Sequence, residues 1–257
     1  MKRTIIERSI LATLILVVLF ISNSYSQETE TNEGVYIYLQ EHIVSPQNSA
    51  AHTEWFKEFK VIADATGAPD YSVASNNAGK TIFITIGNSL AGYDEMNSKF
   101  GEWFQNNPKA GELQSKYGHT IDYTRDEVWR HSPLHSYTPA GYDNSVSRPY
   151  SRVHTVYIKS NEMPKVDEAI KNFKATYTEA GISFAVRAYW NVFGEEKECV
   201  VIVSSFKDRQ AWLDSEEEVS TKINADILKD LQQKWNALQR KSSTTESWSN
   251  PELGHSN

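Results

Sequence analysis

An ungapped internal repeat constrains the fold of this chain more than any other feature of its sequence. The segment EWFKEFKVIADATG (54–67) matches EAIKNFKATYTEAG (168–181), with the second copy 114 positions after the first. Apolar residues recur in each copy with the spacing of an amphipathic helix. Each copy ends in a glycine, Gly67 or Gly181, where a helix often needs a residue with positive φ. The repeat therefore predicts two equivalent helices in two equivalent halves.

The segments around these helices follow the same order in both halves. A strand-like run precedes each helix, GVYIYLQ (34–40) in the first half and RVHTVYIK (152–159) in the second. Two further strand-like runs and a second helical stretch follow each helix. The order predicts strand, helix, strand, strand, helix and strand, twice.

The two halves also end alike. EVWRHSPL (127–134) resembles ESWSNPEL (246–253), which predicts that Trp129 and Trp248 occupy equivalent places on the two fourth strands. The boundaries follow from a segment rich in Pro, Gly and Ser that separates the halves. We expect a first unit at 34–135, a linker at 136–149 and a second unit at 150–253.

This order predicts an α+β protein made of two tandem ferredoxin-like βαββαβ units. A single such sheet leaves one face bare, so we expect the two bare faces to pack sheet to sheet as a pseudo-dimeric α/β barrel. In element order and duplication the chain resembles the dimeric α/β-barrel superfamily. That superfamily includes antibiotic-biosynthesis-monooxygenase-like domains, NIPSNAP-like domains and tandem haem proteins akin to chlorite dismutase. The resemblance covers nearly the whole mature chain and implies this fold with a short set of uses.

Strand alternation predicts which side chains face the barrel interior. The rule assigns aliphatic residues of the strands, such as Ile37, Cys199 and Val201, to the helix side. The candidate ligand-binding residues, assigned to the interior, are Tyr36, Tyr38, Gln40, His42, Tyr157, Lys159, Arg187 and Tyr189, with Glu127 and Trp129 on the fourth strand. Two interpretations stay open: these groups fill the barrel as a core with paired charges, or they orient one organic ligand in a cleft.

The N-terminal segment predicts export. Lys2 and Arg3 precede the apolar run 10–21, and a small-residue site follows at 24–26, which is the order of a signal peptide over residues 1–26. The apolar run is shorter than a membrane-spanning helix, so no stable membrane anchor is expected after cleavage. The protein is then periplasmic or secreted. The single cysteine, Cys199, has no partner for an internal disulfide.

Composition and motifs exclude several function classes. The formal net charge is −7 and the basic residues are scattered, so nucleic acid is not an expected partner. The sequence has no phosphate loop, dinucleotide fingerprint or serine-hydrolase elbow. His131 and His135 are too far apart on a strand to share one metal ion, so neither a metal nor another cofactor is expected.

Three functions remain as hypotheses. The first is an exported small-molecule-binding or accessory protein that uses the cleft between the two units. The second is a cofactor-independent monooxygenase-like enzyme acting on a small organic substrate, with catalytic residues unknown and His42, Tyr38 and Arg187 as the groups to test. The third is a haem-binding tandem barrel, which needs a proximal histidine. A small organic ligand and a homodimer are the partners that the sequence allows.

The export prediction can be tested by expressing the full chain in a bacterial host. We expect the recovered protein to begin near Gln27, because the small-residue site ends at Ser26. Intact-mass analysis of the exported fraction measures this start. A product that keeps residues 1–26 contradicts the prediction.

Overall fold

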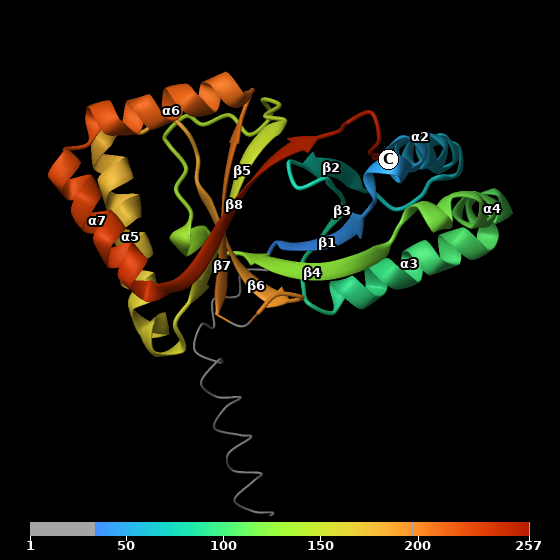
Figure 1. Ribbon diagram of the computed structural model, residues 1–257, viewed down its shortest axis with the longest axis horizontal. Coiled ribbons are helices and arrows are strands. Elements are labelled where there is room, and N and C mark those ends of the chain that lie inside the picture. The colour runs from blue at the N-terminus through green and yellow to red at the C-terminus, as the bar shows by residue number, and fades with distance from the viewer. Residues whose placement is uncertain (1–33, 197, 257) are drawn as a thin grey trace, which may run out of the picture. The chain divides into compact units, whose positions relative to one another are not determined.

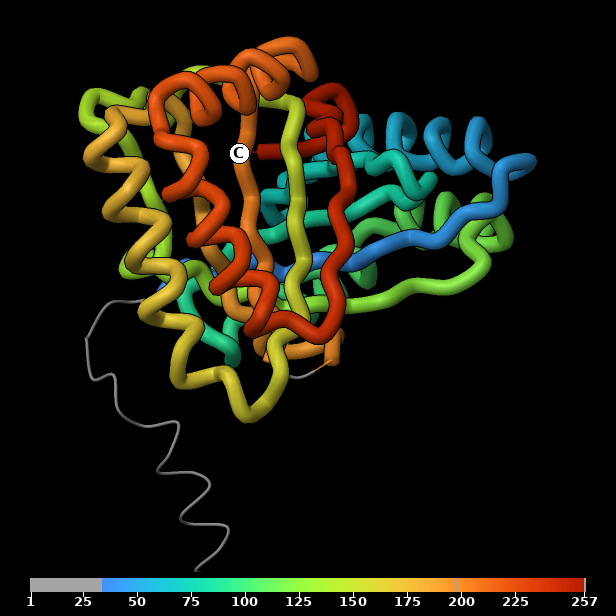
Figure 2. Tube along the Cα trace, turned by 60° about the vertical axis from the view of Figure 1, so that its left-hand side comes forward, coloured from blue at the N-terminus to red at the C-terminus, as the bar shows by residue number. Residues whose placement is uncertain are grey.

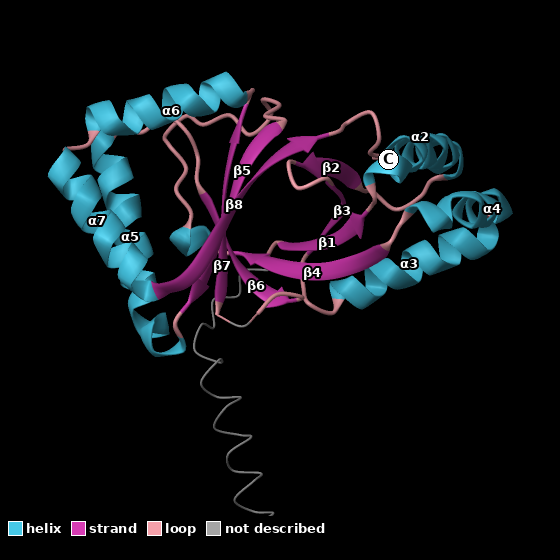
Figure 3. Ribbon diagram, in the orientation of Figure 1, coloured by secondary structure: helices cyan, strands magenta, loops and turns pink. Residues whose placement is uncertain are grey.

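The described part of the protein, residues 34–196 and 198–256 of a computed structural model, contains eight strands and six α-helices (Figures 1 and 3). The strands are β1 (Tyr36–Ile43), β2 (Ser72–Asn76), β3 (Lys80–Gly87), β4 (Tyr123–His131), β5 (Tyr150–Ile158), β6 (Arg187–Phe193), β7 (Cys199–Phe206) and β8 (Gln239–Ser249). The helices are α2 (Ser49–Thr66), α3 (Gly92–Asn106), α4 (Pro108–Tyr117), α5 (Met163–Ala180), α6 (Arg209–Lys222) and α7 (Ala225–Leu238). The predicted signal peptide lies outside the described residues.

The strands form one closed antiparallel barrel in the order β1-β3-β2-β8-β5-β7-β6-β4. In each half the first strand lies between the third and fourth strands, and the second strand lies beyond the third. The barrel closes where β4 pairs with β6 and where β2 pairs with β8. Helices α2, α3 and α4 cover one side of the barrel, and α5, α6 and α7 cover the other (Figures 1 and 2). Closure leaves no unpaired sheet edge between the halves.

The repeated helices end as the sequence predicts. Gly67 at the end of α2 has φ 67°, and Gly181 at the end of α5 has φ 59°. Both values lie in the left-handed region, where glycine avoids the clash of a Cβ atom. Each half has one helix more than expected, because the chain breaks at Asn107-Pro108 between α3 and α4 and at Asn224 between α6 and α7.

The start of the predicted linker is packed rather than free. Tyr137 is buried and forms an isolated β-bridge with Val186. Its hydroxyl donates to the Ile182 carbonyl at 2.7 Å. These contacts anchor the first residues after the first half onto the second half.

The face assignment for β1 is wrong. Tyr38 contacts Tyr93 of α3 and His42 contacts Trp55 of α2, so both side chains lie under the helices. Ile37 instead packs inside the barrel. An alternating strand that is apolar on one face does not say which layer that face meets.

The same reversal occurs on β7, whereas β5 was assigned correctly. Cys199 and Val201 lie in the barrel core with Tyr157, while Val200 packs in the cluster under α5 and α7. Both faces of β7 are apolar, so alternation alone cannot orient it. On β5, Val156 faces the helices and Tyr157 faces the barrel, as expected.

The two similar endings are not structurally equivalent. Trp129 lines the barrel interior and its Nε1 donates to Glu127 at 2.8 Å. Trp248 is 38% exposed and packs edge-on against Tyr150, while its neighbour Ser247 lines the barrel. The prediction of equivalent tryptophans is wrong, because a slip of one residue in a strand moves every side chain to the other face.

A buried ion cluster occupies one end of the barrel. Arg125 contacts Glu195 at 2.7 Å, Glu41 at 3.2 Å and Glu127, whose side chain is only 5% exposed. Lys80 adds a second contact to Glu41 at 2.7 Å. Burial raises the pKa of Glu127, and Trp129 and Arg125 oppose that rise. The interior carboxylates are therefore held by Arg125, a residue that the sequence did not single out.

No helix in the described residues combines the length and the apolar content that crossing a membrane requires.

Arg125→Met tests the ion cluster, because it keeps most of the stem and removes the charge that faces Glu127. Arg125 is partly exposed, so we expect a loss of about 2–3 kcal/mol in the free energy of unfolding, less than for a fully buried pair. Arg187→Met is the matched control. Arg187 bonds the exposed Asn144 at 3.0 Å, and its loss should cost less than about 0.5 kcal/mol. Urea unfolding of both variants measures the difference, and equal losses contradict the assignment.

Candidate functional site

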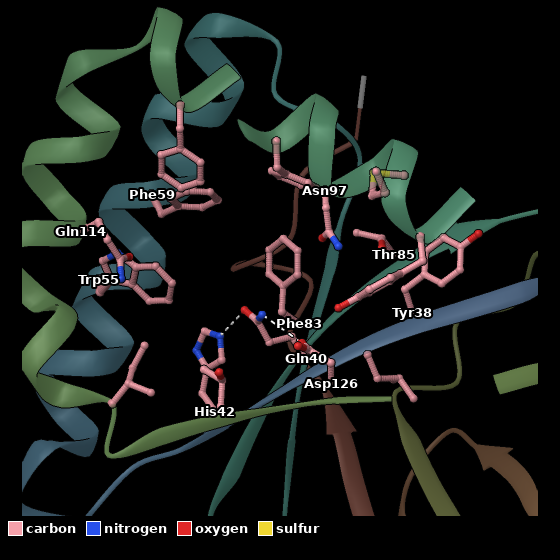
Figure 4. Close-up of a pocket in the computed structure, with 17 residues that line it drawn as sticks. Tyr38, Gln40, His42, Trp55, Phe59, Phe83, Thr85, Asn97, Gln114 and Asp126 are labelled. Atoms are coloured by element: carbon pink, nitrogen blue, oxygen red, sulfur yellow. Dashed lines mark hydrogen bonds between the residues drawn. The ribbon is translucent and has the colours of Figure 1, made fainter. Parts of the chain in front are cut away.

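The candidate site is a cavity of about 400 Å³ between the sheet of the first half and helices α2, α3 and α4 (Figure 4). Its walls are mainly aromatic and aliphatic, and a row of polar side chains crosses its floor. The lining residues include Tyr38, Gln40, His42, Trp55, Phe59, Phe83, Tyr93, Met96, Asn97, Phe100, Phe104 and Asp126. A volume of this size and this mixture of walls is typical of a site for a small organic molecule.

The polar row is a continuous chain of hydrogen bonds from α2 to β4. His52 Nε2 lies 3.0 Å from His42 Nδ1, and His42 Nε2 lies 3.1 Å from Gln40 Oε1. Gln40 Nε2 then donates to Asp126 Oδ1 at 3.0 Å. Figure 4 shows the last two links, with Gln40 between His42 and Asp126. The chain exists because Gln40 and His42 share one face of β1 and Asp126 pairs with Gln40 across the strands.

The carboxylate of Asp126, at one end of this series of hydrogen bonds, determines which atom donates and which accepts in each of them. An ionised Asp126 only accepts, so the Gln40 amide must turn its NH₂ to Asp126 and its oxygen to His42. His42 must then donate from Nε2, which leaves its Nδ1 lone pair to accept from His52. His42 has no free lone pair for a substrate. It is therefore a positioning residue for Asp126, and Asp126 is the group that can accept a ligand's proton.

Burial keeps both histidines neutral. It lowers the pKa of His42 to about 3, and the neighbouring His52 lowers it further. Burial also lowers the pKa of His52 to about 4. His42 stacks on Phe56 and packs against Trp55, so little water reaches either ring. The chain thus holds Asp126 without placing a positive charge beside it.

Tyr38 is fixed in the wall of the cavity. Its hydroxyl donates to the Ser89 carbonyl at 2.6 Å, and burial raises its pKa. The Tyr38 hydroxyl can reach this carbonyl because residues 87 and 92 are glycines. A Cβ atom would stand 2.1 Å from the hydroxyl at Gly87 and 2.4 Å from it at Gly92. Tyr38 therefore supplies a ring rather than a free acid or base.

Helix α3 contributes two further polar side chains to the cavity, those of Tyr93 and Asn97. Tyr93 interacts with both Asn97 and Asp126, and burial raises the pKa of its phenol. Asn97 lines the cavity and is exposed to solvent.

The other candidate residues do not join this cavity. Tyr157, Tyr189, Glu127 and Trp129 lie in the barrel interior, where Tyr157 donates to Glu195 at 2.7 Å and Trp129 to Glu127. Lys159 was assigned to the interior but lies outside, where its Nζ bonds the Ala237 carbonyl at 2.8 Å.

Two assigned residues lie at the margins. Tyr36 shares the helix-side face of β1 with Tyr38 but does not line the cavity. Arg187 bonds Asn144 and is not enclosed with Tyr38. Tyr38 and Arg187, both assigned to the barrel interior from the sequence, therefore do not share one enclosed cavity with Tyr157 or Tyr189.

A second cavity, of about 410 Å³, lies under the helices of the second half. His154 lines it, and its Nδ1 lies 2.8 Å from Thr244 Oγ1, while the Ser243 backbone makes a further hydrogen bond to the ring. His135 also lines it, but both of its nitrogens already have partners, in Ser132 and Asp167. Within residues 34–196 and 198–256, no three His, Cys, Asp or Glu side chains are grouped to hold a metal ion. The haem hypothesis stays a prediction, tested by the absorbance spectrum of the purified protein.

Comparison with known proteins identifies the fold. No protein-family model and no curated protein matches the sequence. Among solved structures, an anthrone oxidase-like protein superposes with a TM-score of 0.57 at 14% identity, over 86% of this chain and 92% of its own. A protein named as a monooxygenase from Lactobacillus acidophilus NCFM gives 0.51 at 9% identity, over 84% and 94%. Chlorite dismutase from Candidatus Nitrospira defluvii gives 0.51 at 12% identity, over 87% and 93%.

The chain has the dimeric α/β-barrel fold. The three solved structures cover 84–87% of it, and the closed eight-stranded antiparallel barrel is present in the described residues. The likeness is one of fold, since the identities are too low to carry an activity across.

Acid should unfold the protein partly through the two buried histidines. Their pKa values are lower in the folded state than the ordinary value near 6.5, so the unfolded chain binds more protons and stability falls as the pH falls from about 6.5 toward 5. We expect His52→Gln, which keeps a donor toward His42, to reduce this slope by up to about 1.4 kcal/mol per pH unit.

Urea unfolding between pH 6.5 and 5 measures the slope, above the range in which most carboxylates titrate. The matched control is His119→Gln, because His119 is exposed. If His52→Gln and His119→Gln give the same slope as the unmodified protein, the buried neutral pair is contradicted.

Proposed function

We propose that the protein binds one small, largely aromatic molecule in the first-half cavity, with a hydroxyl group of that molecule donating to Asp126. One observation carries the proposal. A single carboxylate, oriented by the chain through Gln40 and His42, stands in a cavity whose other lining side chains are uncharged. A hydroxyl is the natural partner for such a carboxylate, since charge-assisted hydrogen bonds are the stronger ones.

The apolar walls support an aromatic ligand. Phe83 and Phe100 meet edge to face with ring centroids 5.4 Å apart, and Phe59 and Phe104 continue the wall at 5.9 Å. Aromatic rings prefer edge-to-face and offset contacts, so a flat ring entering the cavity extends an existing pattern. Burial of that ring provides affinity, and Asp126 provides orientation.

Cofactor-independent oxygenation is a second candidate, favoured by the position of Asp126 in a cavity with aromatic walls. The carboxylate would take a proton from an acidic C–H of the substrate, and the carbanion would pass electrons to dioxygen. A C–O bond forms, the O–O bond breaks, and a CH₂ group with one O₂ becomes a carbonyl and one water. Structural neighbours that include an anthrone oxidase-like protein and a named monooxygenase support this candidate.

The proposal also includes the architecture of the two halves, the cellular location and the oligomeric state. We infer that each half is a ferredoxin-like unit, supported by the identical pairing order of the strands in the two halves. Export through the N-terminal signal would place the site outside the cytoplasm. A homodimer remains a prediction, tested by the native mass.

The binding proposal is tested with 4-benzylphenol and its methyl ether, 4-benzylanisole, which lacks the donor. We expect 4-benzylphenol to bind more tightly, and Asp126→Asn to weaken it about tenfold while leaving the ether unchanged, because a neutral acceptor replaces a charged one. Titration followed by tryptophan fluorescence measures both affinities.

The matched control is Glu216→Gln, which removes a carboxylate that lines the second-half cavity. Its affinity for 4-benzylphenol should equal that of the unmodified protein. Equal binding of phenol and ether, or equal losses in the two variants, contradicts a role for Asp126.

The oxygenase candidate needs a separate measurement. An oxygen electrode with anthrone, whose CH₂ group is acidic, should show oxygen uptake that Asp126→Asn abolishes. Binding without uptake would leave the protein as a binding module.

A further inference from the structure

A serine, a histidine and an aspartate form a hydrogen-bonded series that joins the end of the first half to a helix of the second. Ser132 Oγ lies 2.7 Å from His135 Nδ1, and His135 Nε2 lies 2.7 Å from Asp167 Oδ1. Ser132 precedes a 3₁₀ turn that His135 ends, and Asp167 lies on α5. Both distances are those by which a base activates a hydroxyl group while a third group orients the base, about 2.6–3.2 Å.

The carboxylate of Asp167 determines which atom donates in this series. Hydrogen bonds from Lys171, at 2.7 Å, and from His135 keep the pKa of Asp167 below its usual value, so it is ionised and only accepts. His135 must then donate from Nε2, which leaves the lone pair of its Nδ1 to accept the Ser132 proton. The two ring nitrogens exchange the places they have in the familiar Ser-His-Asp triad, but either nitrogen of a neutral imidazole can accept when the other donates.

The base is shielded, whereas the turn that carries the serine meets solvent. His135 is 8% exposed, and its ring packs edge-on against Trp190 with the centroids 5.6 Å apart. The backbone N–H of Ser132 donates to the Ala188 carbonyl at 2.9 Å, which fixes the serine relative to β6. Ser132 is partly exposed, and Leu134 is 46% exposed. The series therefore lies at the surface with its base held in one orientation.

The second-half cavity adjoins the base. His135 lines this cavity of about 410 Å³, and its other walls include Ile170, Phe173 and Trp235. Apolar and aromatic walls of this kind bind an apolar group by burial. The cavity can therefore hold the acyl part of a substrate whose reacting carbon lies beside the turn.

A positive charge lies at the same turn. Lys174 of α5 also lines the cavity, and its Nζ donates to the carbonyls of Leu134 at 3.1 Å and Pro133 at 3.5 Å. An ammonium group has three N–H donors, so one remains. That donor is available to the negative charge that forms on a carbonyl oxygen under attack.

We propose that Ser132 and His135, oriented by Asp167, form an esterase site for carboxylic esters with an apolar acyl group. Ser132 Oγ bonds to the carbonyl carbon of the ester while its proton passes to His135 Nδ1. The bond from that carbon to the alcohol oxygen then breaks, and the alcohol leaves with the proton. Water repeats the sequence in place of the serine, which releases the acid and restores Ser132. This activity is separate from the binding proposed for the first-half cavity.

The first test is covalent labelling with an ethoxy fluorophosphonate, which forms a bond from phosphorus to an activated serine oxygen and loses fluoride. We expect the protein to gain the mass of one probe, and peptide mapping to place the probe on Ser132. Ser132→Ala should lose the adduct. Ser145→Ala is the matched control and should label normally, because Ser145 is exposed and bonds Asp143 at 2.7 Å but, among the described residues, no histidine.

The second test is hydrolysis of two esters, 4-nitrophenyl phenylacetate and 4-nitrophenyl acetate. We expect kcat/KM to be about tenfold higher for the phenylacetate, because its ring is buried in the second-half cavity. His135→Gln should lower kcat at least about a hundredfold, since the base is lost. Asp167 is a positioning residue, so Asp167→Asn should lower kcat and leave KM unchanged, and Asp167→Glu should restore part of kcat. His119→Gln, at an exposed histidine, is the control.

Three outcomes overturn the esterase site: no adduct forms, the adduct lies on another residue, or Ser132→Ala hydrolyses both esters at the unmodified rate. Equal kcat/KM for the two esters overturns the apolar acyl class. Thermal melts show whether His135→Gln, a change at a buried residue, keeps the fold. If it does not, the mapped adduct and Ser132→Ala still decide. Failure of 4-benzylphenol to bind in the first-half cavity leaves this result unaffected.

Discussion

Closure of the barrel by pairing between the two halves is the constraint on which the rest of the structure depends. Pairs β4·β6 and β2·β8 leave no free edge between the two sheets, and the bare faces of both sheets become one interior. That interior holds aliphatic side chains such as Ile37 and Val201, the rings of Tyr157, Tyr189 and Trp129, and an ion cluster around Arg125. The opposite face of β1, with Tyr38, Gln40 and His42, lies under the helices, which is where the cavity forms.

The cavity then depends on one chain of hydrogen bonds. Burial makes His42 and His52 neutral, and their tautomers follow from the carboxylate of Asp126 through Gln40. A chain of fully satisfied polar groups in a low-dielectric setting is stiff, because breaking any link leaves a buried group unpaired. Asp126 is held in place by this chain and by Tyr93 of α3.

The architecture could be predicted from sequence because duplication is a long-range signal. The matching helices with their terminal glycines, Gly67 and Gly181, fixed the element order in both halves. Face assignment failed because β1 alternates tyrosine with isoleucine, and either set can meet the helices or the barrel. The prediction of equivalent tryptophans failed for a related reason. Trp129 and Trp248 lie in similar local sequences, but their strands differ by one residue in register, so the two side chains lie on opposite faces.

Part of the site could be predicted and part could not. Tyr38, Gln40 and His42 were found as a polar row on β1, although they were assigned to the wrong face. Asp126 was missed, because a carboxylate in a charged strand looks like a surface residue. Its place in the cavity depends on cross-strand pairing with Gln40, which only the folded chain shows.

Photolabelling tests the location of the site most directly. Under near-ultraviolet light, 4-hydroxybenzophenone inserts its carbonyl carbon into a nearby C–H bond and adds its whole mass to the protein. Peptide mapping should place the label on residues that line the first-half cavity, such as Met96 of α3, and Asp126→Asn should reduce it. Label in the barrel interior, in the second-half cavity, or spread over the surface would contradict the account.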